Sequence, residues 1–133
     1  AKKILKYHKK NHNDLTTNLN LPIGMFSYAI NVKSLKKVIL KKNSKNTETW
    51  VEYFKGMKNF KVCDYGKPFF KPNVRLTIDF KEDLQTVNEV LKNCPKKYPK
   101  VNDVIILSKR KPNIFKINSH IVQKAVTKPI FKK

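Results

Sequence analysis

The residues of this chain with the clearest chemical potential are the carboxylates in the segment RLTIDFKEDLQTVNEVL (residues 75–91). The pattern predicts a strand with Leu76 and Ile78 at its apolar positions, then Asp79, then a helix that begins near Phe80. In open α/β sheets, ligands bind beyond the carboxyl ends of the strands. A carboxylate at such an end can hold Mg²⁺ beside substrate phosphates. Asp79 is therefore a candidate metal ligand.

The same acids have a structural explanation. Asp79 would cap the helix, and Glu82 and Asp83 would interact favourably with the positive end of the helix dipole. The two explanations are compatible, because a capping residue at a strand end can also face a ligand.

Other polar residues are weaker candidates. His120, in NSHIVQK, could act as a general base or contact a phosphate, although a single histidine in a polar loop is more often structural. Lys124 in the same stretch is a candidate phosphate contact. His8 and His12 are four residues apart and could bind a metal on a helix face, but no third ligand is near them in the sequence.

Glycine-rich phosphate-binding motifs are absent. The sequence has three glycines, Gly24, Gly56 and Gly66, and contains neither G-x-G-x-x-G nor a P-loop. It also has no G-x-S-x-G segment, so the sequence establishes no hydrolase nucleophile.

The charge of the chain invites a nucleic-acid hypothesis. Thirty Lys and Arg residues against nine Asp and Glu give a net charge of +21, which attracts polyanions. Only Arg75 and Arg110 are arginines, however, and bidentate recognition of phosphates and bases favours arginine. The alternative is that lysines simply occupy most solvated positions.

The 133 residues, 40% of them hydrophobic, suit a single α/β domain spanning residues 1–133. Strand patterns alternate with helix patterns, which predicts a mixed or mainly parallel sheet with flanking helices. No apolar run suits a membrane helix or a signal peptide, so we expect a cytoplasmic protein with Cys63 and Cys94 as free thiols. Expected strands are residues 15–19, 25–32, 60–65 and 75–78. Expected helices lie in residues 2–10, 34–39, 47–54, 80–91 and 101–111, with Ser34 and Thr47 as caps. Trp50, Tyr53 and Phe54 have the i, i+3, i+4 spacing of one helix face, and the expected inward residues are Leu84, Val87, Val90 and Leu91 in residues 80–91 and Val101, Val104, Ile105 and Ser108 in residues 101–111.

Four segments between about Asp14 and Lys124 resemble the cytidylyltransferase-related sugar-nucleotide family, with the spore coat polysaccharide biosynthesis protein F group as the nearest branch. They are NLNLPIGMFSYAINVKSLKKV, NTETWVEYFKGMKNFKV, VRLTIDFKEDLQTVNEVL and INSHIVQK. The third contains the signature R-x-T-x-D-x-x-E-D-L, and the fourth matches I-N-x-H-x-x-Q-K. The resemblance implies a partial Rossmann-like nucleotidyltransferase fold.

The resemblance also implies roles for individual residues. Asp79 would be the second metal-binding aspartate, helping Mg²⁺ to neutralise a triphosphate, and Thr17 and Asn18 would lie near the sugar or nucleotide. Asn118, His120 and Lys124 would belong to a terminal motif without an assigned chemical role. The parent reaction transfers CMP from CTP to an acidic or amino sugar and releases pyrophosphate.

The sequence departs from the family pattern in ways that point to its C-terminal half. The Gly-rich loop and the first metal aspartate of the family's first half have no counterpart here, Tyr28 replaces a glutamate, and Thr49 replaces a histidine. We therefore expect a fragment, a split subunit or a degenerate descendant, inactive without a partner chain that supplies the first half. The alternatives are a lysine-rich module that binds nucleic acid or another polyanion, and a non-catalytic remnant that forms homodimers.

Overall fold

A computed structural model describes residues 2–45, 50–66, 74–122 and 128–132. These residues form two compact units, each described by itself below. The first unit comprises the described parts of Ala1–Asn18, Ser27–Gly66 and Lys124–Lys133; the second comprises those of Leu19–Phe26 and Lys67–Gln123. The expectation of a single domain stays a prediction.

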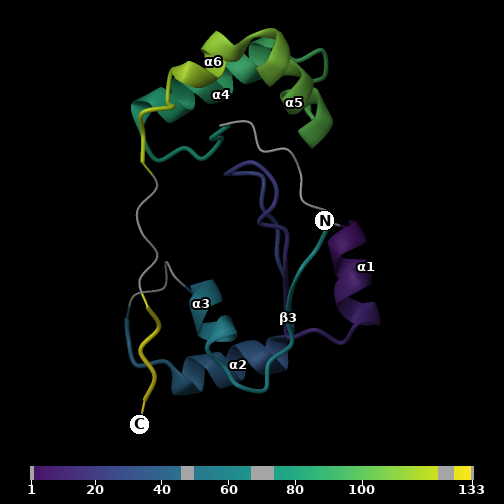
Figure 1. Cartoon of the computed structure of the whole chain (residues 1–133), viewed down its shortest axis with the longest axis vertical. Helices are drawn as coiled ribbons and strands as arrows, with labels where there is room; N and C mark the ends of the chain where they lie inside the picture. Colours follow the sequence, from purple (N-terminus) through teal and green to yellow (C-terminus); the bar gives the residue numbers. More distant parts are fainter. Residues whose placement is uncertain (1, 46–49, 67–73, 123–127, 133) are drawn as a thin grey trace. The chain divides into compact units, whose positions relative to one another are not determined.

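The first unit is built around a small mixed sheet (Figure 1). Its elements are α1 (Lys2–Lys10), β1 (Leu15–Thr17), β2 (Ala29–Ile30), α2 (Val32–Lys41), α3 (Trp50–Lys55) and β3 (Val62–Asp64). The strand order is β2-β1-β3, with β1 antiparallel to β2 and parallel to β3. The predicted mixed α/β class is therefore confirmed, although the strands are shorter than the sequence pattern indicated.

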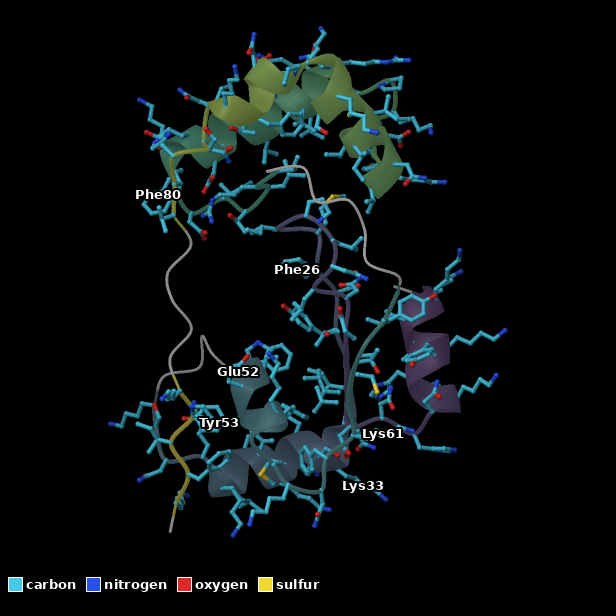
Figure 2. The ribbon with its side chains drawn as sticks, viewed as in Figure 1. Phe26, Lys33, Glu52, Tyr53, Lys61 and Phe80 are labelled. Carbon is cyan, nitrogen blue, oxygen red and sulfur yellow. The ribbon has the colours of Figure 1, made fainter. Side chains whose placement is uncertain are left out.

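The apolar core of the first unit lies between this sheet and helices α2 and α3. Leu15, Val38, Tyr53 and Phe54 are buried at its centre. The hydroxyl oxygen of Tyr53, labelled in Figure 2, also binds the last segment of the chain, because it accepts a hydrogen bond from the Ile130 amide at 3.2 Å. The predicted spacing of Trp50, Tyr53 and Phe54 on one helix is confirmed; the predicted cap Thr47 lies outside the described residues.

Helix α2 begins earlier than the sequence suggested. Asn31, not Ser34, is its N-cap, since the Asn31 Oδ1 atom accepts from the amides of Lys33 at 2.9 Å and Ser34 at 3.4 Å. Ser34 lies inside the helix and is buried, with its hydroxyl donating to the Asp14 carboxylate. The prediction failed because both residues are good caps and local sequence does not say which one leaves the helical conformation.

The second unit consists mainly of helices α4 (Lys81–Asn93), α5 (Val101–Arg110) and α6 (Pro112–Lys116) (Figure 1). Pro112 begins α6, where its missing amide hydrogen breaks no intrahelical bond. The core contains Val74, Val90, Cys94, Val104, Leu107, Ile114 and Phe115. The inward positions predicted for Val104, Ile105 and Ser108 on α5 are confirmed, whereas Val101, also predicted inward, is only partly buried.

The predicted strand at Leu76 and Ile78 is wrong. In the described part of this segment only Arg75 forms a bridge, parallel to Ile23, and Ile78 is exposed. The pairing does not extend beyond this single bridge, because the segment of Ile23 turns at Gly24, where φ is +91°. A Cβ atom on Gly24 would lie 2.4 Å from the carbonyl carbon of Leu76, so the two backbones touch directly there.

The inward face of α4 also differs from the prediction. Asp83, Thr86 and Val90 are buried, whereas Leu84 and Leu91 are about half exposed. The helix is rotated about its axis so that the carboxylate of Asp83 faces the interior. The spacing of the hydrophobic residues alone could not predict this orientation.

The cysteines and the lengths of the helices can be compared directly with the sequence predictions. Cys63 and Cys94 are free thiols, as predicted. None of the helices in the described ranges is long and apolar enough to cross a membrane.

Candidate functional site

The candidate site in the second unit is built on a buried ion pair between Arg75 and Asp83. Arg75 Nε donates to Asp83 Oδ1 at 3.0 Å, and Arg75 Nη2 donates to Asp83 Oδ2 at 3.1 Å. The side chain of Arg75 is 7% exposed and that of Asp83 is 0% exposed. This bidentate geometry satisfies both oxygens of a carboxylate that has left water, which is the condition for a tolerable buried charge.

Asp83 also closes the N-terminus of α4. Its Oδ2 atom accepts from the backbone amides of Asp79 at 3.1 Å and Phe80 at 3.2 Å. Phe80, labelled in Figure 2, is the N-cap residue and has no capping side chain of its own. The expectation that Asp79 caps the helix is therefore wrong, because Asp83 reaches back from the first turn to bind the free amides.

The protonation states of the pair follow from these contacts. The hydrogen bond from Arg75 lowers the pKa of Asp83 from 3.8 to about 2; burial opposes this shift, and hydrogen bonds from Asn118 and the Asp79 amide assist it. The hydrogen bond to Asp83 likewise raises the pKa of Arg75, although burial opposes it. Both groups are charged at neutral pH.

Asp79 lies at the solvent-facing end of this cluster. Its Oδ2 atom accepts from Arg75 Nη2 at 2.7 Å, and its side chain is 57% exposed. Arg75 therefore binds one carboxylate that is buried and one that is open to solvent. With two carboxylates and one guanidinium, the trio carries one net negative charge in a strongly basic chain.

Asp79 fits a metal ion only as a single ligand. An exposed carboxylate is a suitable donor for Mg²⁺, which keeps several waters and takes one or two protein carboxylates beside substrate phosphates. Within the described ranges, no group of three or more His, Cys, Asp or Glu side chains could hold a metal ion without such additional ligands. Asp79 as a metal ligand stays a prediction.

Asn118 joins the terminal motif to the aspartate segment. Its Nδ2 atom donates to Asp83 Oδ1 at 2.8 Å and to the backbone oxygen of Arg75 at 3.0 Å. Asn118 is 1% exposed, and its Oδ1 atom is buried without a hydrogen-bond partner among the described residues; the same holds for the Thr77 hydroxyl. The two motifs that the sequence singled out are thus parts of one hydrogen-bonded cluster.

The other candidate of the terminal motif that the structure describes is His120. His120 is exposed, two residues beyond Asn118. Lys124 lies outside the described residues. Their expected roles in substrate binding stay predictions.

Thr17 and Asn18 lie in the first unit. Thr17 is buried and donates its hydroxyl to Asp64 Oδ1 at 2.6 Å, at the end of the paired strands β1 and β3. Asn18 accepts from the Ser27 amide at 2.6 Å and donates to the Ser27 hydroxyl at 3.0 Å. The Thr17 side chain therefore links β1 to β3, and the Asn18 side chain orders the segment that follows β1; their expected proximity to a sugar or nucleotide stays a prediction.

The metal site considered for His8 and His12 does not form. Helix α1 ends at Lys10, and His12 follows with φ +50°, so the two histidines do not share a helix face. His8 is buried, with its Nδ1 atom 3.0 Å from the Thr16 hydroxyl oxygen. Asn13 donates to the same oxygen at 2.9 Å, which makes this a structural polar cluster beneath α1.

Comparison with known proteins identifies the fold. No protein family and no curated protein matches the sequence. Among solved structures, a cytidylyltransferase from Leptospira borgpetersenii serovar Hardjo-bovis matches with a TM-score of 0.70 and 21% identity over 90% of this chain. This chain has the fold of part of a cytidylyltransferase. It spans about half the length of that enzyme, since the match covers 51% of the solved chain.

The likeness of fold does not by itself assign chemistry to the cluster. Sequence reasoning identified Asp79 and Asn118 separately and did not recognise Asp83 as the residue that connects them. The available signal was the three-residue spacing between Phe80 and Asp83, which suits an acid that reaches back to a helix N-terminus. Asp64 was missed as well, although it ends a strand in the same way as the predicted position of Asp79.

Proposed function

We propose that this chain is the part of a cytidylyltransferase that carries the second metal-binding aspartate, Asp79. The reaction would transfer CMP from CTP to an acidic or amino sugar with Mg²⁺, in the manner of the spore coat polysaccharide biosynthesis protein F group. The observation that carries the proposal is the joining of the two motifs through Asn118 and Asp83. The likeness of fold to a solved cytidylyltransferase supports it.

The residues of this chain would contribute position and charge. Mg²⁺, when bound, would neutralise the triphosphate, and Asp79 would hold the ion through the carboxylate that faces solvent. Arg75 and Asp83 are buried and mutually satisfied, so they support Asp79 and are not available to a substrate. By the resemblance, Thr17 and Asn18 would lie near the sugar or nucleotide, and His120 and Lys124 would complete the substrate-binding set. Asn118 belongs to the same motif, but it is buried and would support the site without touching a substrate.

Catalysis would also require the remainder of the fold. Phosphoryl and nucleotidyl transfer depend on positioning and electrostatic stabilisation of the triphosphate, and a single carboxylate supplies little of either. We propose that a complementary half, from a partner chain or another segment, supplies the glycine-rich loop, and that the chain is inactive without it. The absence of a G-x-G-x-x-G or P-loop in this sequence supports that requirement.

The test is a calorimetric titration of CTP with and without Mg²⁺ into the chain and into Asp79→Asn. We expect saturable binding that depends on Mg²⁺ and weakens about tenfold or more in Asp79→Asn, because each lost charge-assisted contact is worth on the order of 1.5–3 kcal/mol. Glu89→Gln is the matched control, since Glu89 is an acid on α4 whose carboxylate contacts Lys92 and Asn93 and belongs to neither of the two motifs. Equal binding by wild type and Asp79→Asn, or no binding at all, would contradict a CTP site on this chain.

A second candidate function is the binding of a polyanion, and the surfaces of α1 and α2 favour it. Neither helix contains an acid, and every lysine on them is exposed. A protein that neutralises several phosphates loses affinity steeply as salt rises. Binding to mixed duplex and single-stranded oligonucleotides between low and moderate salt tests this function, and a salt-independent or undetectable interaction would exclude it.

A further inference from the structure

The geometry points to a role for the terminal motif: we infer that Asn118 is a positioning residue for Asp79, acting through Asp83 and Arg75. Part of this inference rests on the proposed function, because Asp79 needs a fixed position only if it binds a ligand. Asn118 itself does not contact Asp79. Its effect would pass through two groups that it contacts directly.

The first step is that the side-chain amide of Asn118 forms two hydrogen bonds. Its Nδ2 atom donates to Asp83 Oδ1 and to the backbone oxygen of Arg75, at 2.8 and 3.0 Å. One side chain therefore fixes both a side chain of α4 and the backbone of the segment before it. Since Asn118 is 1% exposed, water cannot easily replace these bonds.

The second step is that Asp83 and Arg75 both bind Asp79 directly. Asp83 Oδ2 accepts from the Asp79 amide at 3.1 Å, and Arg75 Nη2 donates to Asp79 Oδ2 at 2.7 Å. Asp79 is therefore held at its main chain and at its carboxylate by the two groups that Asn118 fixes. Its side chain still remains 57% exposed.

The third step is energetic. A surface ion pair usually contributes little, because ordering two long side chains offsets the attraction. Here Arg75 is 7% exposed and already ordered by Asp83, so holding Asp79 requires ordering only one short side chain. Supporting contacts of this kind are what pre-orient a binding group before its ligand arrives.

The test compares Asn118→Leu, which has a similar size but no donors, with Asn118→Ser, which is shorter and keeps a hydroxyl. Asn113→Leu is the matched control, because Asn113 is an exposed asparagine on α6 of the same unit. The first readout is hydrogen exchange by NMR in the chain without ligand. We expect exchange of the Asp79 and Phe80 amides and of the Arg75 Nε proton to speed up about tenfold or more in Asn118→Leu.

A purely structural role predicts a different pattern. Loss of general stability would speed exchange equally at amides deep in α4, such as that of Val90, whereas a positioning role affects the three named protons selectively. Asn118→Ser should show the same selectivity with a smaller effect, which keeps the test valid if Asn118→Leu folds poorly. Unchanged exchange at the three protons, or an equal increase at Val90, would overturn the inference whether or not the chain binds CTP.

The second readout is the Mg²⁺-dependent part of CTP binding in a double-mutant cycle with Asp79→Asn. If Asn118 acts through Asp79, Asn118→Leu should weaken this part in the wild-type background by about tenfold and have no further effect in Asp79→Asn. Additive losses would contradict action through Asp79. Absence of CTP binding by the wild type would count against the proposed function alone, since the exchange readout decides the positioning role independently.

Discussion

Asn118 and Asp83 are 35 residues apart in the sequence, yet the Asn118 Nδ2 atom lies 2.8 Å from Asp83 Oδ1 in the interior of the second unit. The contact joins the segment just after the short helix α6 to the first turn of α4. Asp83 in turn binds Arg75 and the amides at the start of α4. One buried carboxylate therefore connects three segments, and its removal should affect the fold far more than removal of its exposed neighbour.

Asp83→Asn is expected to lower the free energy of unfolding of the second unit by about 3–5 kcal/mol, because it leaves the buried guanidinium of Arg75 without its main partner. Asp79→Asn should lower it by less than about 1 kcal/mol, since Asp79 is mostly exposed. Urea unfolding followed by far-ultraviolet circular dichroism measures both. Trp50, the sole tryptophan, lies in the first unit and serves as an internal control by fluorescence. Similar losses for the two variants would refute this division of roles.

The sequence predicted the elements whose signal is local. Helix α1, the aromatic spacing on α3 and the inward face of α5 depend on hydrophobic period, which a short window contains. The fold class also followed from the alternation of element types. The resemblance to cytidylyltransferases rested on motif order, and the fold likeness agrees with it.

The failures of prediction in the second unit share a physical cause, which is competition from contacts distant in the sequence. Leu84 and Leu91 have the spacing of an inward stripe on α4, but the ion pair with Arg75 turns Asp83 inward and leaves both leucines about half exposed. Ile78 has strand character but lacks a neighbouring strand to pair with in the described structure. The local sequence indicates at most that Asp83 can bind the amides at the start of α4; it does not identify Arg75 and Asn118 as the partners of its carboxylate.

Acid should destabilise the second unit in a defined range. The hydrogen bond from Arg75 lowers the pKa of Asp83 to about 2, below its usual 3.8, so the unfolded state takes up the proton first as pH falls. The stabilisation is complete above pH 3.8 and is lost as pH falls toward 2; it amounts to about 2 kcal/mol. Urea unfolding of wild type and Asp83→Asn across this range measures it. The variant should lack this part of the pH dependence, and equal slopes would contradict the assignment.

The first unit should respond to pH in a different range, through His8. Burial lowers the pKa of His8 below its usual 6.5, and the nearby Asp14 charge only partly opposes this. The unfolded state therefore binds the proton more readily, so stability is complete above pH 6.5 and declines as pH falls below it. Trp50 fluorescence during urea unfolding reports this unit. His8→Asn should abolish the dependence, whereas His12→Asn, which changes an exposed histidine, should preserve it.

The sharpest structural prediction concerns Gly24. Its φ is +91°, and a Cβ atom there would lie 2.4 Å from the carbonyl carbon of Leu76 and 2.6 Å from the amide nitrogen of Thr77. Gly24→Ala therefore combines an unfavourable backbone conformation with a clash against backbone atoms that cannot rotate away, and should cost about 2–5 kcal/mol. The backbone atoms that would have to move, in Leu76 and Thr77, belong to the segment between Arg75 and Asp79. Gly24→Ala should therefore also weaken Mg²⁺-dependent CTP binding, measured under conditions in which the variant is folded.

Gly56→Ala is the matched comparison. Its Cβ atom would lie 2.8 Å from the ring of Phe131, a side chain that can move, so a loss below about 2 kcal/mol is expected in the first unit. Circular dichroism reports the helices of both units and Trp50 fluorescence reports the first unit, so a loss seen by circular dichroism without a change in Trp50 fluorescence locates the effect in the second unit. Because Gly56 is in the unit that lacks Asp79, its substitution should leave the Mg²⁺ dependence of CTP binding unchanged. A Gly24→Ala protein with wild-type stability would show that the backbone of residues 75–77 does not pack against Gly24, and would remove the support that fixes the start of the candidate site.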